Sequence, residues 1–165
     1  MKTFIEGTPK PKQRPRWSGK FMYSPKTEWE KILTNHFNGL DDYYKHAIQV
    51  DMTFYMPRPK KHYRTGKYSD LLRDDAPKTW HTNKPDRDNL EKAVLDCMTK
   101  GEILKDDCIV CTGTIQKKWA NAKSGVYIEI WGLVIWQRVK AHYNKQKQNN
   151  KLAMIIIVLM IISNL

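Results

Sequence analysis

The stretch K-P-D-R-D-N-L-E-K-A-V-L-D-C-M-T-K-G-E-I-L-K-D-D, residues 84–107, decides how this chain is interpreted. It gathers acidic residues in a chain that has 29 Lys and Arg against 17 Asp and Glu, a formal net charge of +12. Asp86 and Asp88 lie two residues apart, and Asp106 and Asp107 form a pair further along. Carboxylates clustered inside a basic protein are typical of a divalent cation bound where a polyanion docks.

A helix is predicted within this stretch. Asp88 and Glu91 have the spacing of a capping box, which places the start of the helix at Asp88. Apolar residues then recur at helical spacing, and Gly101 is expected to end the helix. Asp88, Lys92 and Asp96 follow one another every four residues, so they share a second face of the helix.

Three of these carboxylates could converge on one point, because Asp86 leaves an extended segment, Asp88 opens the helix and Asp107 opens the next strand. Hard oxygen ligands suit Mg²⁺, with Mn²⁺ as a substitute ion, and such an ion bridges to phosphate and activates water. Lys92 could stabilise the charge that develops on the phosphate. The alternative is structural: a helix cap, a turn residue after Pro85 and a solvated salt-bridged face.

Basic segments elsewhere in the chain are candidate DNA contacts. Residues 9–17 alternate basic residues with prolines, which keep the segment extended, and Trp17 adds a stacking face. Residues 57–83 form a long irregular segment in which basic and aromatic residues are interleaved. The alternative for both is a solvated charge run. The residues expected to bind DNA are Lys10, Lys12, Arg14, Arg16, Lys60, Lys61, Lys84 and Arg87.

The remaining pattern predicts strands and one more helix. Alternating apolar residues predict a half-buried strand over residues 47–56, and a shorter strand is expected over residues 3–5. A helix is expected to run to about Phe37 from a cap at Ser24 or Thr27, and Leu71 with Leu72 are expected to form a helical turn. Residues 107–119 and 125–131 are expected to form a hairpin joined by A-N-A-K-S-G.

The chain has 165 residues, which is enough for one domain with a core. We expect that domain over residues 1–137 and a tail over residues 138–165 with no assigned role. The apolar run at 152–162 is shorter than the roughly 20 residues of a spanning helix, so a membrane partner is not expected. The odd number of cysteines and the lack of an apolar leader indicate a cytoplasmic protein.

The sequence K-P-D-R-D-N-L-E-K-A-V-L-D followed by K-D-D-C-I-V resembles the RusA family of Holliday-junction resolvases. That family carries D-x-D-N-L-x-K-x-x-x-D and then a D-D pair before a strand. Residues 7–17 and 23–30 are also similar to its phage-type members, so the resemblance covers roughly residues 2–131. Two departures are Arg87, where an apolar residue is frequent, and the tail, which lies outside the family pattern.

The resemblance implies an α+β fold, a mixed sheet with flanking helices, in a homodimer that needs no small-molecule cofactor. It implies a Mg²⁺-dependent endodeoxyribonuclease of DNA recombination and repair, which cuts symmetrically related strands of a four-way junction and leaves 5′-phosphates. Carried over by position, the implied metal ligands are Asp86, Asp88 and Asp107, the essential lysine is Lys92, and the supporting positions are Asp96 and Asp106.

Two other functions fit the same residues. A non-catalytic, structure-selective DNA-binding protein would bind DNA tightly and in a salt-sensitive manner. Its binding would not depend on Asp86, Asp88 and Asp107. A metal-dependent nuclease acting on other branched or flap DNA would use the same residues on a different substrate. The D/E-x-K half of the common restriction-type nuclease motif is absent from the chain.

Overall fold

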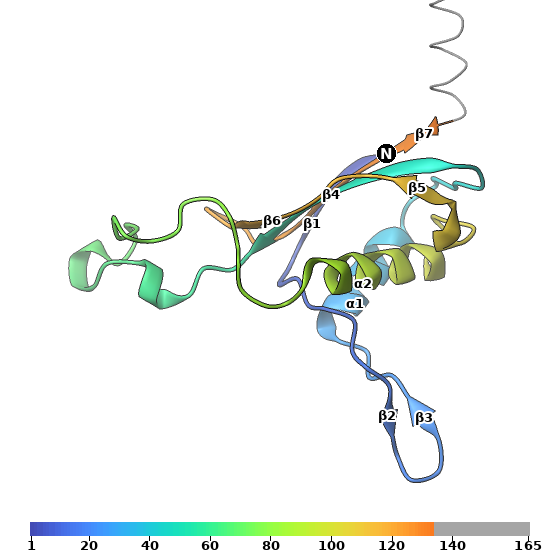
Figure 1. Ribbon diagram of the computed structural model, residues 1–165, viewed down its shortest axis with the longest axis horizontal. Coiled ribbons are helices and arrows are strands. Elements are labelled where there is room, and N and C mark those ends of the chain that lie inside the picture. Colours follow the sequence, from blue (N-terminus) through green and yellow to red (C-terminus); the bar gives the residue numbers. More distant parts are fainter. Residues whose placement is uncertain (134–165) are drawn as a thin grey trace, which may run out of the picture.

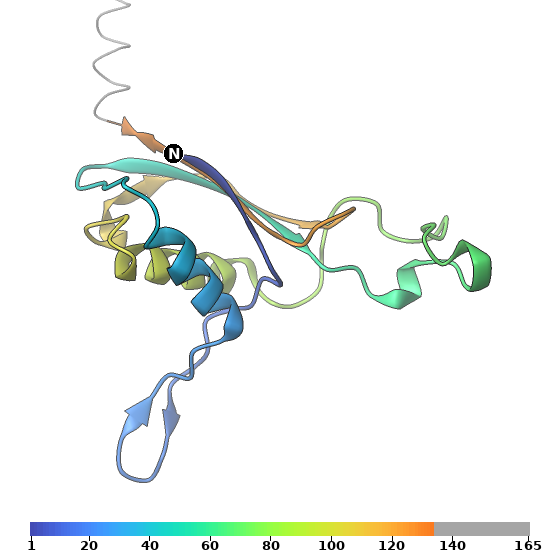
Figure 2. The ribbon, with the colours of Figure 1, turned by 180° about the vertical axis from the view of Figure 1, so that it is seen from behind.

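The computed structural model describes residues 1–133, which form a mixed five-stranded sheet with two helices packed against one of its faces (Figure 1). The expected α+β fold, with a mixed sheet and flanking helices, is therefore confirmed. A separate two-stranded hairpin and a long irregular lobe extend from this body (Figure 2).

The sheet is built around β4 (Ile48–Met56), whose residues alternate between buried and half-buried as the sequence predicts. β4 pairs antiparallel with β7 (Gly125–Gly132) along one edge. Along its other edge it pairs in parallel with β5 (Val110–Thr112) and β6 (Ile115–Trp119). β1 (Lys2–Glu6) pairs antiparallel with β7 and completes the sheet.

The expected hairpin between residues 107–119 and 125–131 is wrong, because β6 and β7 lie on opposite sides of β4. Inserting β4 between them pairs the backbone groups of this apolar strand along both of its edges. The segment expected to be one continuous strand from Asp107 is also divided. It begins with the 3-10 helix η3 (Asp107–Ile109), and β5 and β6 follow with a break at Gly113.

Two helices supply the other half of the core. α1 (Glu28–Phe37) is capped by Thr27 rather than Ser24, in a capping box with Glu30. α2 (Arg87–Lys100) ends at Gly101, as expected. The buried apolar residues that α1 and α2 contribute are Trp29, Leu33, Phe37, Leu90, Val94, Cys97 and Met98.

The capping box expected at Asp88 is wrong. The N-cap residue of α2 is Asp86, in extended conformation, and its side chain makes no capping hydrogen bond. The first helical hydrogen bond runs from the amide of Leu90 to the carbonyl of Asp86, at 3.3 Å. Helical backbone thus begins directly after Pro85 and Asp86, which leaves Asp88 inside the first turn with its carboxylate unused by the cap.

The irregular lobe, residues 57–83, contains two 3-10 turns, η1 (Lys60–His62) and η2 (Gly66–Tyr68). The helical turn expected at Leu71 and Leu72 is wrong, because Leu72 instead forms an isolated β-bridge with Tyr63. The Tyr63–Leu72 bridge is antiparallel, so the chain reverses between these two residues. Gly66 lies between them, and its φ of 65° favours glycine.

Two expectations fall at the end of the chain. The domain boundary at residue 137 and the apolar run at 152–162 lie outside the described residues. Among residues 1–133, none of the helices has the length and apolar character needed to cross a membrane. The three cysteines are free thiols, with Cys97 buried and Cys108 and Cys111 exposed.

Candidate active site

The approach to α2 is fixed along the outer edge of β6. The amide of His81 donates to the carbonyl of Lys117 at 3.1 Å, and the amide of Trp119 donates to the carbonyl of Thr79 at 2.8 Å. These bonds align the last part of the lobe with the strand. The chain therefore reaches the start of α2 from a defined direction.

One side chain of β6 fixes the final residues of that approach. The Lys117 ammonium donates to the carbonyl of Asn83 at 2.8 Å and to the carbonyl of Pro85 at 2.6 Å. Pro85 directly precedes Asp86, so Lys117 positions the backbone from which the first candidate ligand extends. Sequence reasoning missed this role, because no local pattern separates Lys117 from Lys118.

The first turn of α2 presents two of the predicted ligands. Asp86 and Asp88 are both exposed, and neither forms an ion pair with another described residue. The amides at the N-terminus of a helix favour negative charge at this position. Lys92 lies one turn further along and is also exposed. The predicted Asp88–Lys92 row therefore exists as solvent-facing groups without a salt bridge between them.

The acidic pair after α2 is divided between two roles. The Asp106 carboxylate caps η3 by accepting from the amide of Cys108 at 2.9 Å. Hydrogen bonding to the Cys108 thiol and amide holds the pKa of Asp106 below its ordinary value of 3.8. Both acids are exposed, and Asp107 forms no ion pair with a described residue. The supporting position at Asp106 thus has a structural explanation, the cap of a 3-10 turn.

The predicted convergence of three ligands is not formed in this structure. The segment that carries Asp107 lies next to β5 and the last turns of α2, whereas Asp86 and Asp88 belong to the first turn (Figure 1). Across residues 1–133, no group of three or more His, Cys, Asp or Glu side chains is arranged to hold a metal. The donor chemistry of the first turn alone still suits Mg²⁺, which proteins commonly bind through one or two carboxylates plus waters and substrate phosphate.

The sequence of the chain matches the model of a known protein family. The model of the family described as Endodeoxyribonuclease RusA matches residues 6–131. The chain belongs to the RusA endodeoxyribonuclease family. The match spans both helices, the hairpin, the lobe and almost the whole sheet, and it includes every candidate site residue. No curated protein matches the chain in a search of full sequences.

Membership of the RusA family confirms the expected resemblance and assigns the chain to the DNA endonucleases, a group that generally depends on divalent metal. The branched-DNA substrate of the family also agrees with the strong positive charge of the chain, +12.

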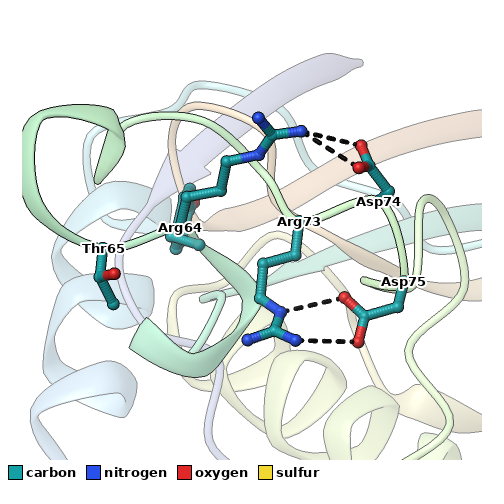
Figure 3. Close-up of a pocket in the computed structure, with 6 residues that line it drawn as sticks. Arg64, Thr65, Arg73, Asp74 and Asp75 are labelled. Carbon is teal, nitrogen blue, oxygen red and sulfur yellow. Dashed lines mark hydrogen bonds and ion pairs between the residues drawn. The ribbon is translucent and has the colours of Figure 1, made fainter.

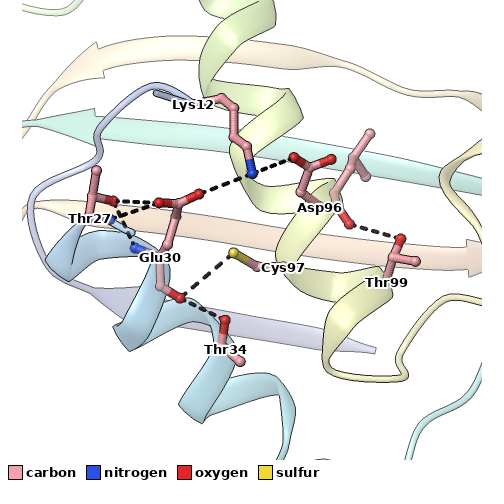
Figure 4. A network of polar contacts seen from close by, with 8 residues as sticks. Lys12, Thr27, Glu30, Thr34, Asp96, Cys97 and Thr99 are labelled. Carbon is pink, nitrogen blue, oxygen red and sulfur yellow. Dashed lines mark hydrogen bonds and ion pairs between the residues drawn. The ribbon is translucent and has the colours of Figure 1, made fainter. Parts of the chain in front are cut away.

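Three residues of the segments that resemble the RusA family hold the two helices together (Figure 4). The Lys12 ammonium lies 2.8 Å from an Asp96 oxygen and 3.2 Å from a Glu30 oxygen, and so joins the helices α1 and α2. Burial alone would lower the pKa of Lys12, but hydrogen bonds to Asp96 and Glu30 outweigh burial and raise it above 10.5. Lys12 is an expected DNA contact and Asp96 an expected supporting position, and in this structure both side chains belong to the ion-pair network between the helices.

The other seven expected DNA contacts are all exposed, and none forms an ion pair with a described residue. They lie in three segments of the chain. These are the N-terminal hairpin region with Lys10, Arg14 and Arg16, the lobe with Lys60 and Lys61, and the start of α2 with Lys84 and Arg87.

The far half of the lobe is less positive than its sequence indicates (Figure 3). Arg64 pairs with Asp74 at 3.0 Å, and Arg73 pairs with Asp75 at 3.0 Å. These pairs line a hollow of about 410 Å³ that contains none of the candidate site residues. Arg64 and Arg73 thus pair with carboxylates inside the lobe. Lys60 and Lys61, the predicted DNA contacts of the lobe, form no ion pair with a described residue.

At the root of the lobe, where it joins the sheet, two histidines pack around one tryptophan. The spacing of the histidines in the sequence did not predict this cluster. His62 and His81 are buried against Trp119, with ring centroids 4.6 and 4.3 Å from the Trp119 ring. Burial lowers the pKa of both histidines below 6.5, and nearby cations add to this effect. Arg58 closes the root by donating to the carbonyl of Ala120 at 3.0 Å.

Proposed function

We propose that this RusA-family chain is a Mg²⁺-dependent endonuclease that resolves four-way DNA junctions by paired symmetric nicks, leaving 5′-phosphates. One observation carries the proposal: Asp86 and Asp88 stand exposed and without ion-pair partners on the first turn of α2, at the place where the family motif lies. In a chain of net charge +12, two carboxylates left unpaired by nearby cations are suited to binding a metal ion.

The residues of the first turn have distinct proposed roles. Asp86 and Asp88 would hold Mg²⁺, or Mn²⁺ as a substitute, and the bound ion would supply a polarised phosphate and a water of lowered pKa. Lys92 would stabilise negative charge on the phosphate. Lys84 and Arg87, exposed on either side of Asp86, would hold the DNA backbone by contacts to its phosphates.

Asp107 is the proposed third ligand, and its role rests on the sequence pattern and on the family resemblance. It is exposed on η3, away from the first turn of α2. Its participation would require the segment that carries it to approach the first turn when DNA and metal bind. Asp107→Asn measures that contribution directly: an Asp107 ligand predicts loss of cleavage, and unchanged cleavage would restrict the ligand set to Asp86 and Asp88.

We propose a homodimer as the working assembly. Each chain carries one first-turn pair of acids, whereas paired symmetric nicks need two sites related by a two-fold axis. Sedimentation of the purified chain across a concentration series would measure its mass. A mass of one chain at every concentration, with and without junction, would contradict the dimer.

A substrate panel tests the function as a whole. The chain would be incubated with a synthetic four-way junction, a fork, a flap and a plain duplex of equal length, each with Mg²⁺ or with EDTA. We expect symmetric nicks in the junction with Mg²⁺ alone, and rejoining of the products by a ligase would verify 5′-phosphates. Preferential cutting of the fork or flap would support the other nuclease, and binding without any cutting would support the non-catalytic protein.

A further inference from the structure

Residues 8–26 form an arm that projects away from the sheet and beyond α1 (Figures 1 and 2). Two short strands, β2 (Arg16–Trp17) and β3 (Met22–Tyr23), pair antiparallel in it. The amide of Ser18 donates to the carbonyl of Phe21 at 3.0 Å and closes the turn. The sequence predicted an extended basic segment here, but not a hairpin.

The tip of the arm exposes large apolar side chains. The exposed fractions are 65% for Trp17, 62% for Phe21, 62% for Met22 and 44% for Tyr23. All four lie within seven consecutive residues, whereas the buried core draws on other parts of the chain. An exposed apolar cluster of this density on a folded protein marks a binding surface rather than scattered surface residues.

The charge around this cluster identifies the chemistry of its partner. No acidic residue occurs between Glu6 and Glu28, and the arm carries exposed Arg14, Arg16 and Lys20. A partner that is both anionic and rich in flat π surfaces is nucleic acid with its base faces accessible. A second copy of this chain does not fit this surface as well, because each copy has a net charge of +12.

The arm is fastened where the candidate acids lie. The backbone amide of Lys12 donates to the carbonyl of Asn89, in the first turn of α2, at 3.1 Å. The Lys12 side chain bridges Glu30 and Asp96, so the root of the arm is held to both helices. The root of the arm is therefore tied to the residue that follows Asp88 in the first turn of α2.

We propose that the arm is a stacking platform for base faces left uncovered at the branch point of DNA, and that it gives this nuclease its preference for branched over continuous duplex DNA. Bases in a continuous duplex are covered by their neighbours, whereas a branch point or a single strand offers free base faces. The identity of the substrate rests on the proposed function, but binding by the arm does not require cleavage.

The test measures binding by the full chain in EDTA, which separates it from cleavage. The probes are a four-way junction with 2-aminopurine at the branch point, a duplex and a single strand of equal length. The double variant Trp17→Ser with Phe21→Ser is compared with Tyr43→Ser, which removes an exposed aromatic ring from the segment between α1 and β4.

We expect the arm variant to weaken junction and single-strand binding on the order of 10-fold or more, with duplex binding changed less than about 2-fold. We also expect it to abolish the change in 2-aminopurine fluorescence that binding of the wild-type chain produces, whereas Tyr43→Ser leaves both readouts unchanged. Thermal unfolding monitored by circular dichroism confirms that the variants fold, since both arm positions are exposed.

Three results would overturn the proposal. Equal weakening on duplex and junction would reduce the arm to a general backbone contact. Unchanged binding would remove it from the DNA interface. A drop in sedimentation mass of the arm variant without DNA would assign its apolar tip to a second copy of the chain. A wild-type chain that shows the arm effect but never cuts DNA would refute the nuclease proposal and leave this one standing.

Discussion

Lys117 shows that a side chain remote from the chemistry can determine where a candidate ligand stands. Its ammonium holds the carbonyls of Asn83 and Pro85 at 2.8 and 2.6 Å, directly before Asp86. The residue pattern around α2 predicted the exposed positions of Asp88 and Lys92 correctly. It could not predict Lys117, because that contact joins residues 32 and 34 positions apart and depends on the order of the strands.

We expect Lys117→Met to lower the nicking rate of the junction about 10-fold or more, because misplacing a reacting group by a fraction of an ångström is costly. Junction binding in EDTA should change less than about 2-fold, since the exposed phosphate contacts remain. Lys117→Arg should recover part of the rate by restoring a donor to the two carbonyls. Rates would be measured in single-turnover assays over a Mg²⁺ series.

Lys118→Met is the matched control, because the Lys118 ammonium lies over the Trp80 ring, 5.4 Å from its centroid, and not at the start of α2. Equal losses of rate in the two variants would show that Lys117 has no positioning role beyond the general charge of β6.

At the scale of secondary-structure elements, the interface between α1 and α2 depends on one lysine placed between two carboxylates. The side chains of Lys12, Glu30 and Asp96 are 20%, 7% and 24% exposed, so solvent screens this network only in part. The helices themselves could be predicted from apolar spacing and caps. Their ionic link could not, because Lys12 lies in a proline-rich segment that resembles a solvated arm.

Lys12→Met should lower the free energy of unfolding by about 1–3 kcal/mol, because two partly buried carboxylates lose their cation. Lys31→Met removes the exposed partner of Glu28 and should cost less than about 0.5 kcal/mol. Urea unfolding of both variants would measure the difference. Similar costs for the two lysines would contradict a structural role for Lys12.

The pH dependence of the same pair has a defined sign. Burial opposes ionisation of Glu30, but hydrogen bonds from Thr27 and Lys12 hold its pKa below 4.5. The resulting stabilisation is present above pH 4.5 and is lost as the pH falls through the pKa of the folded state. The difference in unfolding free energy between wild type and Lys12→Met should therefore narrow below pH 4.5.

The root of the lobe should respond to pH in a higher range. Burial lowers the pKa values of His62 and His81 below 6.5, so protonation opposes their packing against Trp119. Stability from this contact is complete above pH 6.5 and declines as the pH falls below it. Hydrogen-exchange protection of the His81 and Trp119 amides should fall between pH 7.5 and 5.5, relative to protection in β1 and β7. Equal changes in both regions would contradict local loosening of the lobe.

At the scale of the whole molecule, the first turn of α2 lies between the roots of the two projections. The arm is bonded to Asn89, and the last part of the lobe reaches Pro85 along β6. The elements were largely predictable, because periodicity is a local property of the sequence. The placement of β4 between β6 and β7 was not, since strand pairing is set by contacts that are distant in sequence. The sequence could name candidate ligands, and their binding of a metal stays a prediction. Across residues 1–133 no three of them gather in a group arranged to hold a metal ion.

The central claim is that the first-turn carboxylates of α2 carry the nuclease chemistry of this RusA-family chain. The most direct test is the single-turnover rate of nicking a four-way junction in Mg²⁺ by Asp88→Asn, compared with Glu91→Gln, which removes a negative charge from the same helix. We predict that Asp88→Asn binds the junction as tightly as wild type but has a nicking rate at least about 100-fold lower. Glu91→Gln should nick the junction at the wild-type rate. Nicking by Asp88→Asn at the wild-type rate would contradict the account.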